Sequence, residues 1–250
     1  VEVFLACATL GEAGLVSTDY LKDGQTISAL RSQELQCSAQ ALGLKQVFLL
    51  GYRDSGMPGS SDNFHPQALI AQPLQAVVDK IAAVIREVQP EVVLTFDPIG
   101  GYHHPDHIRI HEATVQAFEL ARSTPSGAVT VPSGLYFHIM PRRLVRTSIF
   151  FLRLSGKDPH KSGEQGDIDL VEIARHSFPT HVKINYQEVA EKQARAAACH
   201  ASQGGGEKPK GLAKLFMRLY DQPVDLYMQS WPPPSARQKV KRDFFEELDG

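Results

Sequence analysis

The stretch EVVLTFDPIGGYHHPDH (residues 91–107) joins an apolar run to a cluster of histidines. Residues 91–97 carry apolar side chains on both faces, as is typical of a strand in a covered parallel sheet. Gly100 and Gly101 allow a sharp turn and a close approach of the backbone to a ligand. Pro105 suits the first turn of a helix that we expect to end near Arg122. The stretch therefore predicts a strand, a turn and a helix in succession.

The same alternation extends over the first half of the chain. Strands are expected at 1–10 and 46–52, and helices at Ile27–Leu42 and 73–89, the second of which keeps the apolar spacing of one buried face. The second half is less regular: residues 134–141 and 145–154 look like consecutive strands of an antiparallel edge, followed by a helix at 187–202. We predict a single α/β domain over 1–250, with about 204–250 less diagnostic. The expected architecture is Rossmann-like, with a mainly parallel sheet flanked by helices on both faces.

Composition narrows the function classes. The chain has 250 residues, 42% of them hydrophobic, and a net charge of −2, which gives no indication of a nucleic-acid partner. No apolar run approaches the roughly 20 residues that span a bilayer. Its three cysteines, Cys7, Cys37 and Cys199, are widely separated and show no CxxC spacing, so neither a disulfide framework nor a thiolate zinc site is expected. A reducing, cytoplasmic compartment fits this pattern best.

The histidine cluster lies where open α/β sheets bind ligands, at the carboxyl end of a strand. In one interpretation, one imidazole binds a metal while a neighbour handles protons or developing negative charge. In a second, His103, His107 and His111 form an i, i+4, i+8 ladder, with a metal held by the last two. In a third, the histidines only cap the helix. Three histidines within residues 103–107, beside an aspartate and a glycine turn, favour a functional site.

The segment DPIGGYHHPDHIRIHEAT (97–114) resembles the second signature of the LmbE-like, or PIG-L-like, zinc-dependent N-deacetylases, which act on N-acetylglucosaminyl conjugates. Further stretches agree with the family in order, so that the resemblance covers about residues 1–203: ATLGEAG (8–14), RSQE (31–34), FLLGYRDSGM (48–57) and KQARAAACHASQ (192–203). The HPDH motif after a Gly-Gly turn is specific, whereas GEAG alone is weak.

The resemblance implies roles for four residues of the histidine cluster. His107 would bind the metal, and His104 would be the protonated group that stabilises the tetrahedral intermediate or protonates the leaving amine. Asp106 would orient His104 and balance its charge. Tyr102 would donate its hydroxyl to the oxyanion. No role is expected for His103, and we expect His111 to pack against the site or to support it.

Four further residues match positions that line the sugar pocket of the family, namely Glu12, Arg31, Asp54 and Met57. Charged groups of this kind suit a sugar because they form directional hydrogen bonds to its hydroxyls. Structural interpretations compete with this one. Arg31 and Glu34 are spaced as an i, i+3 surface ion pair, Asp54 could cap a turn, and Met57 could fill a gap in the core.

The first signature of the family, a strand followed by Ala-His-Pro-Asp-Asp-Glu, is absent from this chain. In the family it lies upstream of the position of Val1, so we expect the first strand, the remaining ligands of one Zn²⁺ per subunit, and the general base to lie there. The sequence predicts a zinc-dependent hydrolase that removes an N-acetyl group from a small N-acetylglucosamine-type conjugate, in a possible homo-oligomer. The alternatives are an amidase of a glucosamine-containing thiol conjugate and a non-catalytic sugar-binding or scaffold homologue without the metal site.

Overall fold

The computed structural model describes residues 1–123, 131–163, 165–206 and 223–246. Contacts between residues divide the chain into two compact units. Unit 1 contains Val1–Gly56, Ser60–Gln72 and Tyr186–Pro223, and unit 2 contains Met57–Gly59, Pro73–Asn185 and Val224–Gly250. Each unit is described separately below.

Unit 1 contains a parallel strand pair with a helical connection. Strand β1 (Phe4–Cys7) pairs in parallel with β2 (Gln46–Leu49), and Phe4 lies opposite Gln46. Helix α1 (Ile27–Leu42) joins them, as predicted. It begins where the Thr26 hydroxyl accepts the Ala29 N–H at 3.1 Å, and it ends at Gly43, whose φ is +71°. Short 3-10 turns occupy Thr18–Tyr20, Ser61–Phe64 and Leu69–Ala71.

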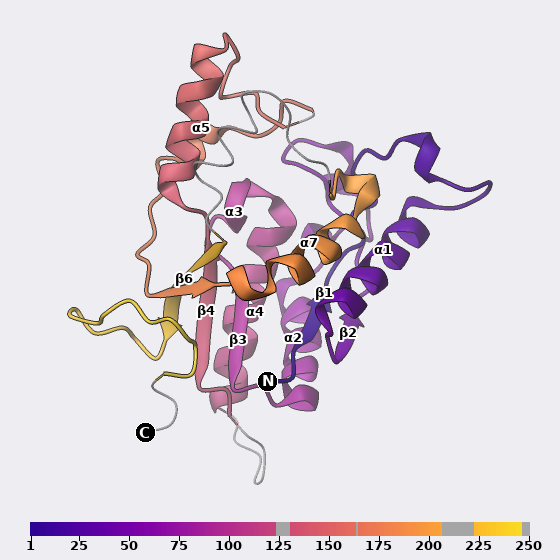
Figure 1. Cartoon of the computed structure of the whole chain (residues 1–250). Helices are drawn as coiled ribbons and strands as arrows, with labels where there is room; N and C mark the ends of the chain where they lie inside the picture. The colour runs from indigo at the N-terminus through magenta and orange to yellow at the C-terminus, as the bar shows by residue number, and fades with distance from the viewer. Residues whose placement is uncertain (124–130, 164, 207–222, 247–250) are drawn as a thin grey trace. The chain divides into compact units, whose positions relative to one another are not determined.

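A disulfide bond joins Cys37 in α1 to Cys199, with the two Cα atoms 5.7 Å apart. Helix α7 (Ala190–Ala198) lies beside α1 in Figure 1, and Cys199 directly follows it. The expectation of no disulfide was therefore wrong. The two cysteines are 162 residues apart, so their spacing carried no signal, and only the packing of α7 on α1 brings them together. The predicted helix at 187–202 is also shorter than expected, with 3-10 turns at Gln187–Val189 and Ala201–Gln203 on either side of α7.

Unit 2 contains a four-stranded sheet in the order β3-β4-β6-β5. Strand β3 (Val92–Phe96) pairs in parallel with β4 (Gly134–Ile139), whereas β6 (Val224–Trp231) runs antiparallel to β4 and to β5 (Val182–Asn185). Helix α4 (Pro105–Ser123) packs on β3 and on α2 (Leu74–Val88). The core of this layer includes Phe118, Leu135 and Phe137. The predicted α/β class, with parallel pairs flanked by helices, is confirmed.

The prediction of a strand at 145–154 was wrong, because Arg142–Leu154 forms helix α5. Pro141 precedes its first turn, and Val145 and Ile149, spaced one helical turn apart, are buried against Ile173 of the short helix α6 (Leu170–Ile173). The strand was predicted because aromatic and β-branched residues, which favour strands, are frequent in this segment. The antiparallel strands are instead β5 and β6. Among the described residues, no helix combines the length and the apolar character needed to cross a membrane.

Candidate active site

Asp97 builds the turn that carries the histidine cluster of unit 2. Its side chain is 2% exposed, and its Oδ1 accepts the N–H groups of Ile99 at 3.1 Å and Gly101 at 2.8 Å. The short helix α3 (Gly100–His103) follows at once. Gly100 has a φ of +63°, and a Cβ there would lie 2.8 Å from the Cβ of His107. Sequence analysis missed Asp97, although an acid between a buried strand and Pro98 was a signal for a turn cap.

His107 lies flat on the ring of Phe96, the last residue of β3, with ring centroids 3.9 Å apart and planes 7° apart. Its Nδ1 lies 3.1 Å from the carbonyl oxygen of Gly100. Because a carbonyl can only accept, Nδ1 carries the proton and Nε2 carries the lone pair. A metal-binding histidine has this arrangement, in which a backbone carbonyl fixes the tautomer and the orientation of the ring.

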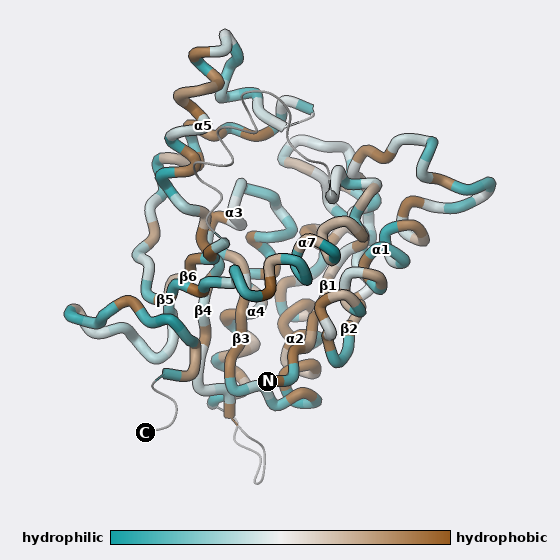
Figure 2. Tube along the Cα trace, in the orientation of Figure 1, coloured by the Kyte–Doolittle hydropathy of each residue, from teal (hydrophilic) through white to brown (hydrophobic). Residues whose placement is uncertain are grey.

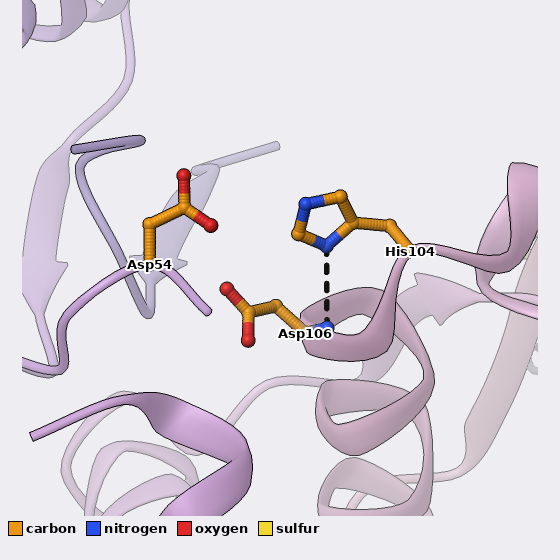
Figure 3. A group of neighbouring side chains, drawn as sticks. All are labelled: Asp54, His104 and Asp106. Atoms are coloured by element: carbon orange, nitrogen blue, oxygen red, sulfur yellow. Dashed lines mark hydrogen bonds between the residues drawn. The ribbon is translucent and has the colours of Figure 1, made fainter. Parts of the chain in front are cut away.

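His104 has the opposite tautomer. The backbone N–H of Asp106 donates to its Nδ1 at 3.2 Å (Figure 3), so the neutral ring keeps its proton on Nε2 and presents a donor there. The hydrogen bond that orients the His104 ring thus comes from the backbone of Asp106. Asp106 itself is buried, at 3% exposed. The Tyr102 ring lies 5.8 Å from that of His104 and 5.2 Å from that of His107, so the three side chains are neighbours.

The other two histidines of the ladder have different surroundings. His103 has a left-handed backbone, with φ +65°, and its ring lies 5.3 Å from that of His176. His111 donates from Nδ1 to the carbonyl of Phe96 at 2.7 Å, and its ring packs edge-on against Phe137. These contacts agree with a packing role for His111.

Three of the four predicted sugar-binding residues lie in unit 1, and two of them are in contact. Glu12 accepts the hydroxyl of Ser28 at 3.1 Å and the N–H of Asp54 at 3.0 Å. Asp54 is 6% exposed and accepts the N–H groups of Gly56 at 2.9 Å and Ala13 at 3.3 Å. Arg31 donates to the carbonyl oxygens of Gly11 and Leu15. Asp54 therefore caps a turn. Met57 is half-buried and belongs to unit 2.

A cavity of about 480 Å³ opens in unit 1 at the carboxyl ends of β1 and β2. Its lining includes Glu12, Ser28 and Arg53. The Arg53 guanidinium forms an ion pair with Asp62 at 2.7 Å, and this hydrogen bond lowers the pKa of the Asp62 carboxyl. The thiol of Cys7 also lines the cavity, and burial raises its pKa, so the thiol form is favoured.

Glu34 connects two motifs that are far apart in the sequence. Its carboxylate is 7% exposed and accepts the N–H and hydroxyl of Ser202 at 2.7 and 2.8 Å and the side-chain amide of Gln203 at 3.2 Å. Burial raises the pKa of Glu34, but these hydrogen bonds outweigh it and the net pKa is lowered. Arg31 and Glu34 thus bond to different partners. The RSQE and HASQ segments meet because α1 and α7 pack together.

Comparison with known proteins matches residues 1–118 to the PIG-L family, described as GlcNAc-PI de-N-acetylase. A 1D-myo-inositol 2-acetamido-2-deoxy-alpha-D-glucopyranoside deacetylase of Acidothermus cellulolyticus is 32% identical over 212 residues, which cover 81% of this chain and 70% of the relative. An enzyme of the same name from Kineococcus radiotolerans is 39% identical, over 62% of this chain and about half (49%) of its own length.

Solved structures share the fold at low sequence identity. GalB, the 4-carboxy-2-hydroxymuconate hydratase of Pseudomonas putida, aligns over 94% of this chain and 86% of its own, with a TM-score of 0.56 and 16% identity. Dbv21, the deacetylase of the A40926 pseudoaglycone, aligns over 91% and 84%, with a TM-score of 0.50 and 17% identity. A hydratase and a deacetylase on one fold show that the fold alone does not fix the reaction. The match to residues 1–118 and the Acidothermus relative show the family: the chain belongs to the PIG-L-like (LmbE-like) family of hydrolytic N-acetylglucosaminyl deacetylases.

Proposed function

We propose that this protein is a zinc-dependent hydrolase that removes the N-acetyl group of a small N-acetylglucosamine conjugate, of the inositol-linked kind named for its relatives. The observation that carries the proposal is the pair of opposite tautomers at the start of α4. His107 presents a lone pair on Nε2, and His104 presents a proton on Nε2. One ring is thus prepared to bind a cation, and its neighbour is prepared to donate to an oxyanion.

Among the described residues, His107 fits one ligand position of a metal site. A histidine whose Nδ1–H is held by a carbonyl is a suitable zinc ligand, and stacking on Phe96 fixes the direction of its Nε2. Zinc, when bound, would act as a Lewis acid on the acetyl carbonyl and on the attacking water. His107 would hold it, with Asp97 and Gly100 positioning His107 through the turn.

The chain's own groups would handle the charge of the reaction. As water adds to the acetyl carbonyl carbon, the Nε2–H of His104 and the hydroxyl of Tyr102 would donate to the developing oxyanion. The carbon–nitrogen bond then breaks, and the Nε2–H of His104 would pass to the leaving amine nitrogen while Nε2 takes up the proton that the attacking water gives up, so that acetate and the amino sugar are released. Asp106 would hold His104 in this tautomer. Glu12, Arg31, Asp54 and Met57 would bind the sugar.

The test is amine release from N-acetylglucosaminyl inositol by the zinc-loaded protein, combined with metal analysis. We expect His104→Ala to lower kcat about 10²- to 10³-fold while zinc stays bound. His107→Ala should lose zinc, and His103→Ala is the matched control that should keep both zinc and most of the activity.

Three results would contradict the assignment. If His104→Ala retains the wild-type rate, its proposed role is wrong. If the protein cleaves an intact glucosamine-containing thiol conjugate much faster than the acetylated sugar, it is an amidase of such conjugates. If the zinc-loaded protein binds the sugar and releases no amine, it is a non-catalytic homologue.

A further inference from the structure

Helix α5 (Arg142–Leu154) combines arginines with exposed apolar side chains on one surface. Arg142, Arg143, Arg146 and Arg153 are all exposed. On the same outward side, Phe150 is 61% exposed and Leu154 is 72% exposed. We call the outward side of α5 formed by these six residues the Arg-Phe face. Figure 2 shows hydrophilic and hydrophobic positions alternating along α5.

The inner side of α5 is already occupied. Val145 and Ile149 pack against Ile173 of α6, and Tyr102 of the candidate active site packs against the same cluster. The residues of the Arg-Phe face therefore take no part in the packing of α5 on the described residues of its unit. Large apolar side chains left in water on a helix with a packed opposite side indicate a surface that is covered in use.

The charged side chains of α5 all have one sign. No acidic residue occurs between Glu119 and Asp158, although the whole chain has a net charge of −2. Two acids farther along the chain have partners of their own: Glu172 pairs with Arg175 at 2.5 Å, and an oxygen of Asp169 lies 2.9 Å from Nδ1 of His160. The Arg-Phe face therefore attracts an anionic surface.

The polar groups of α5 are compatible with burial at an interface. The hydroxyl of Thr147 donates to the carbonyl of Arg143 at 2.7 Å, and that of Ser148 donates to the carbonyl of Leu144 at 3.0 Å. Because these hydroxyls bond within the helix, covering the helix does not leave their protons without an acceptor.

We propose that the Arg-Phe face docks the protein on an anionic lipid surface. An amphipathic helix lies in the plane of the headgroups when its aromatic and aliphatic side chains enter the acyl boundary and its arginines contact lipid phosphates. Phe150 and Leu154 supply the inserted groups, and the arginines that flank them supply the phosphate contacts. This docking is independent of the proposed catalysis, but it would hold the unit that carries Tyr102 and His104 at a membrane.

The test is co-sedimentation of the full chain with vesicles of phosphatidylcholine alone and of phosphatidylcholine mixed with phosphatidylglycerol. We expect binding only to the anionic vesicles, weakening as salt is added. Arg143→Gln/Arg146→Gln should weaken it about thirty-fold, because each basic residue near an anionic membrane contributes about five-fold. Phe150→Ser/Leu154→Ser should weaken it more than about ten-fold.

Matched controls lie on unit 1. Lys192→Gln/Arg195→Gln removes two exposed charges from α7, and Phe64→Ser removes an aromatic side chain that is 85% exposed. Both should bind vesicles as the wild type does. Far-UV circular dichroism should be unchanged for the arginine pair, which carries the test if the serine pair fails to fold.

Several results would overturn the proposal. These are wild-type protein that does not sediment with anionic vesicles at low salt, equal binding to neutral vesicles, and control variants that lose as much binding as the α5 variants. A dimer in light scattering that the α5 variants dissociate, with no vesicle binding, would assign the face to a second copy of the chain. None of these outcomes bears on amine release, so the proposed function would stand.

Discussion

Replacing Asp97 tests whether one buried carboxylate holds the active-site turn. Its Oδ1 accepts two backbone N–H groups, those of Ile99 and Gly101, at a position that is 2% exposed. Asp97→Ala removes the acceptor and leaves two donors without their partner. A hydrogen bond to a charged group contributes about 1.5–3 kcal/mol, so the free energy of unfolding should fall by about 3 kcal/mol or more. Asp97→Asn keeps an oxygen in the same place and should lose about 1 kcal/mol.

The assay is urea unfolding followed by far-UV circular dichroism, with amine release as the second readout. Because the turn sets the positions of Tyr102 and His104, Asp97→Ala should lower kcat more than it changes KM, and Asp97→Asn should recover most of the loss. Asp158→Ala is the control, since Asp158 caps an exposed turn through the N–H of His160 at 3.0 Å. Equal stability of wild type and Asp97→Ala, within about 1 kcal/mol, would refute the reasoning.

Three further predictions concern the rest of the fold. Cys37→Ser, or reduction of the disulfide by a dithiol, should allow trypsin to cleave α7 at Lys192. Cys7→Ser is the control and should not change the cleavage. If all forms resist trypsin equally, packing alone holds α7 in place. The lowered pKa of Glu34 stabilises the folded state at pH values above the pKa of an ordinary glutamate, and this stability is lost as the pH falls through the lowered pKa. Ser202→Ala should raise the pKa of Glu34 in an NMR titration, and it should flatten the pH dependence of the urea midpoint. His103→Gly should leave the free energy of unfolding unchanged or raise it by about 1 kcal/mol, measured by thermal unfolding, because glycine adopts the φ of +65° without strain. A large loss of stability would mean that the contact of the His103 ring with His176 outweighs the backbone strain.

The local part of the site could be predicted from the sequence. Strand 92–96, the Gly100–Gly101 turn and helix 105–123 follow one another within 32 residues, so short-range rules of strand period, glycine conformation and proline at a helix start sufficed. The neighbouring rings of Tyr102, His104 and His107 follow from that geometry. Asp97 was missed because its role is to accept backbone N–H groups of the turn, and its position between a buried strand and Pro98 was a weak signal for such a cap.

The segment at 145–154 shows where local patterns fail. Its residues include Val145, Ile149, Phe150 and Phe151, which favour strands by intrinsic preference. The i, i+4 spacing of Val145 and Ile149 fits a helix equally well, and contact with α6 selects the helix. Short apolar runs leave this ambiguity, and tertiary packing resolves it.

By itself the sequence determined the α/β alternation, the βα unit that carries HPDH and the order of motifs that places the chain in its family, because each depends on residues that are close along the chain. Only the tertiary structure decided the Cys37–Cys199 bond and the Glu34–Ser202 contact, which join residues 162 and 168 positions apart. It also fixed the tautomer of His107, whose Nδ1 faces the carbonyl of Gly100, whereas the tautomer of His104 is set locally by the N–H of Asp106. The two long-range pairings arise from the packing of one element on another, and the spacing of residues along the chain does not record them.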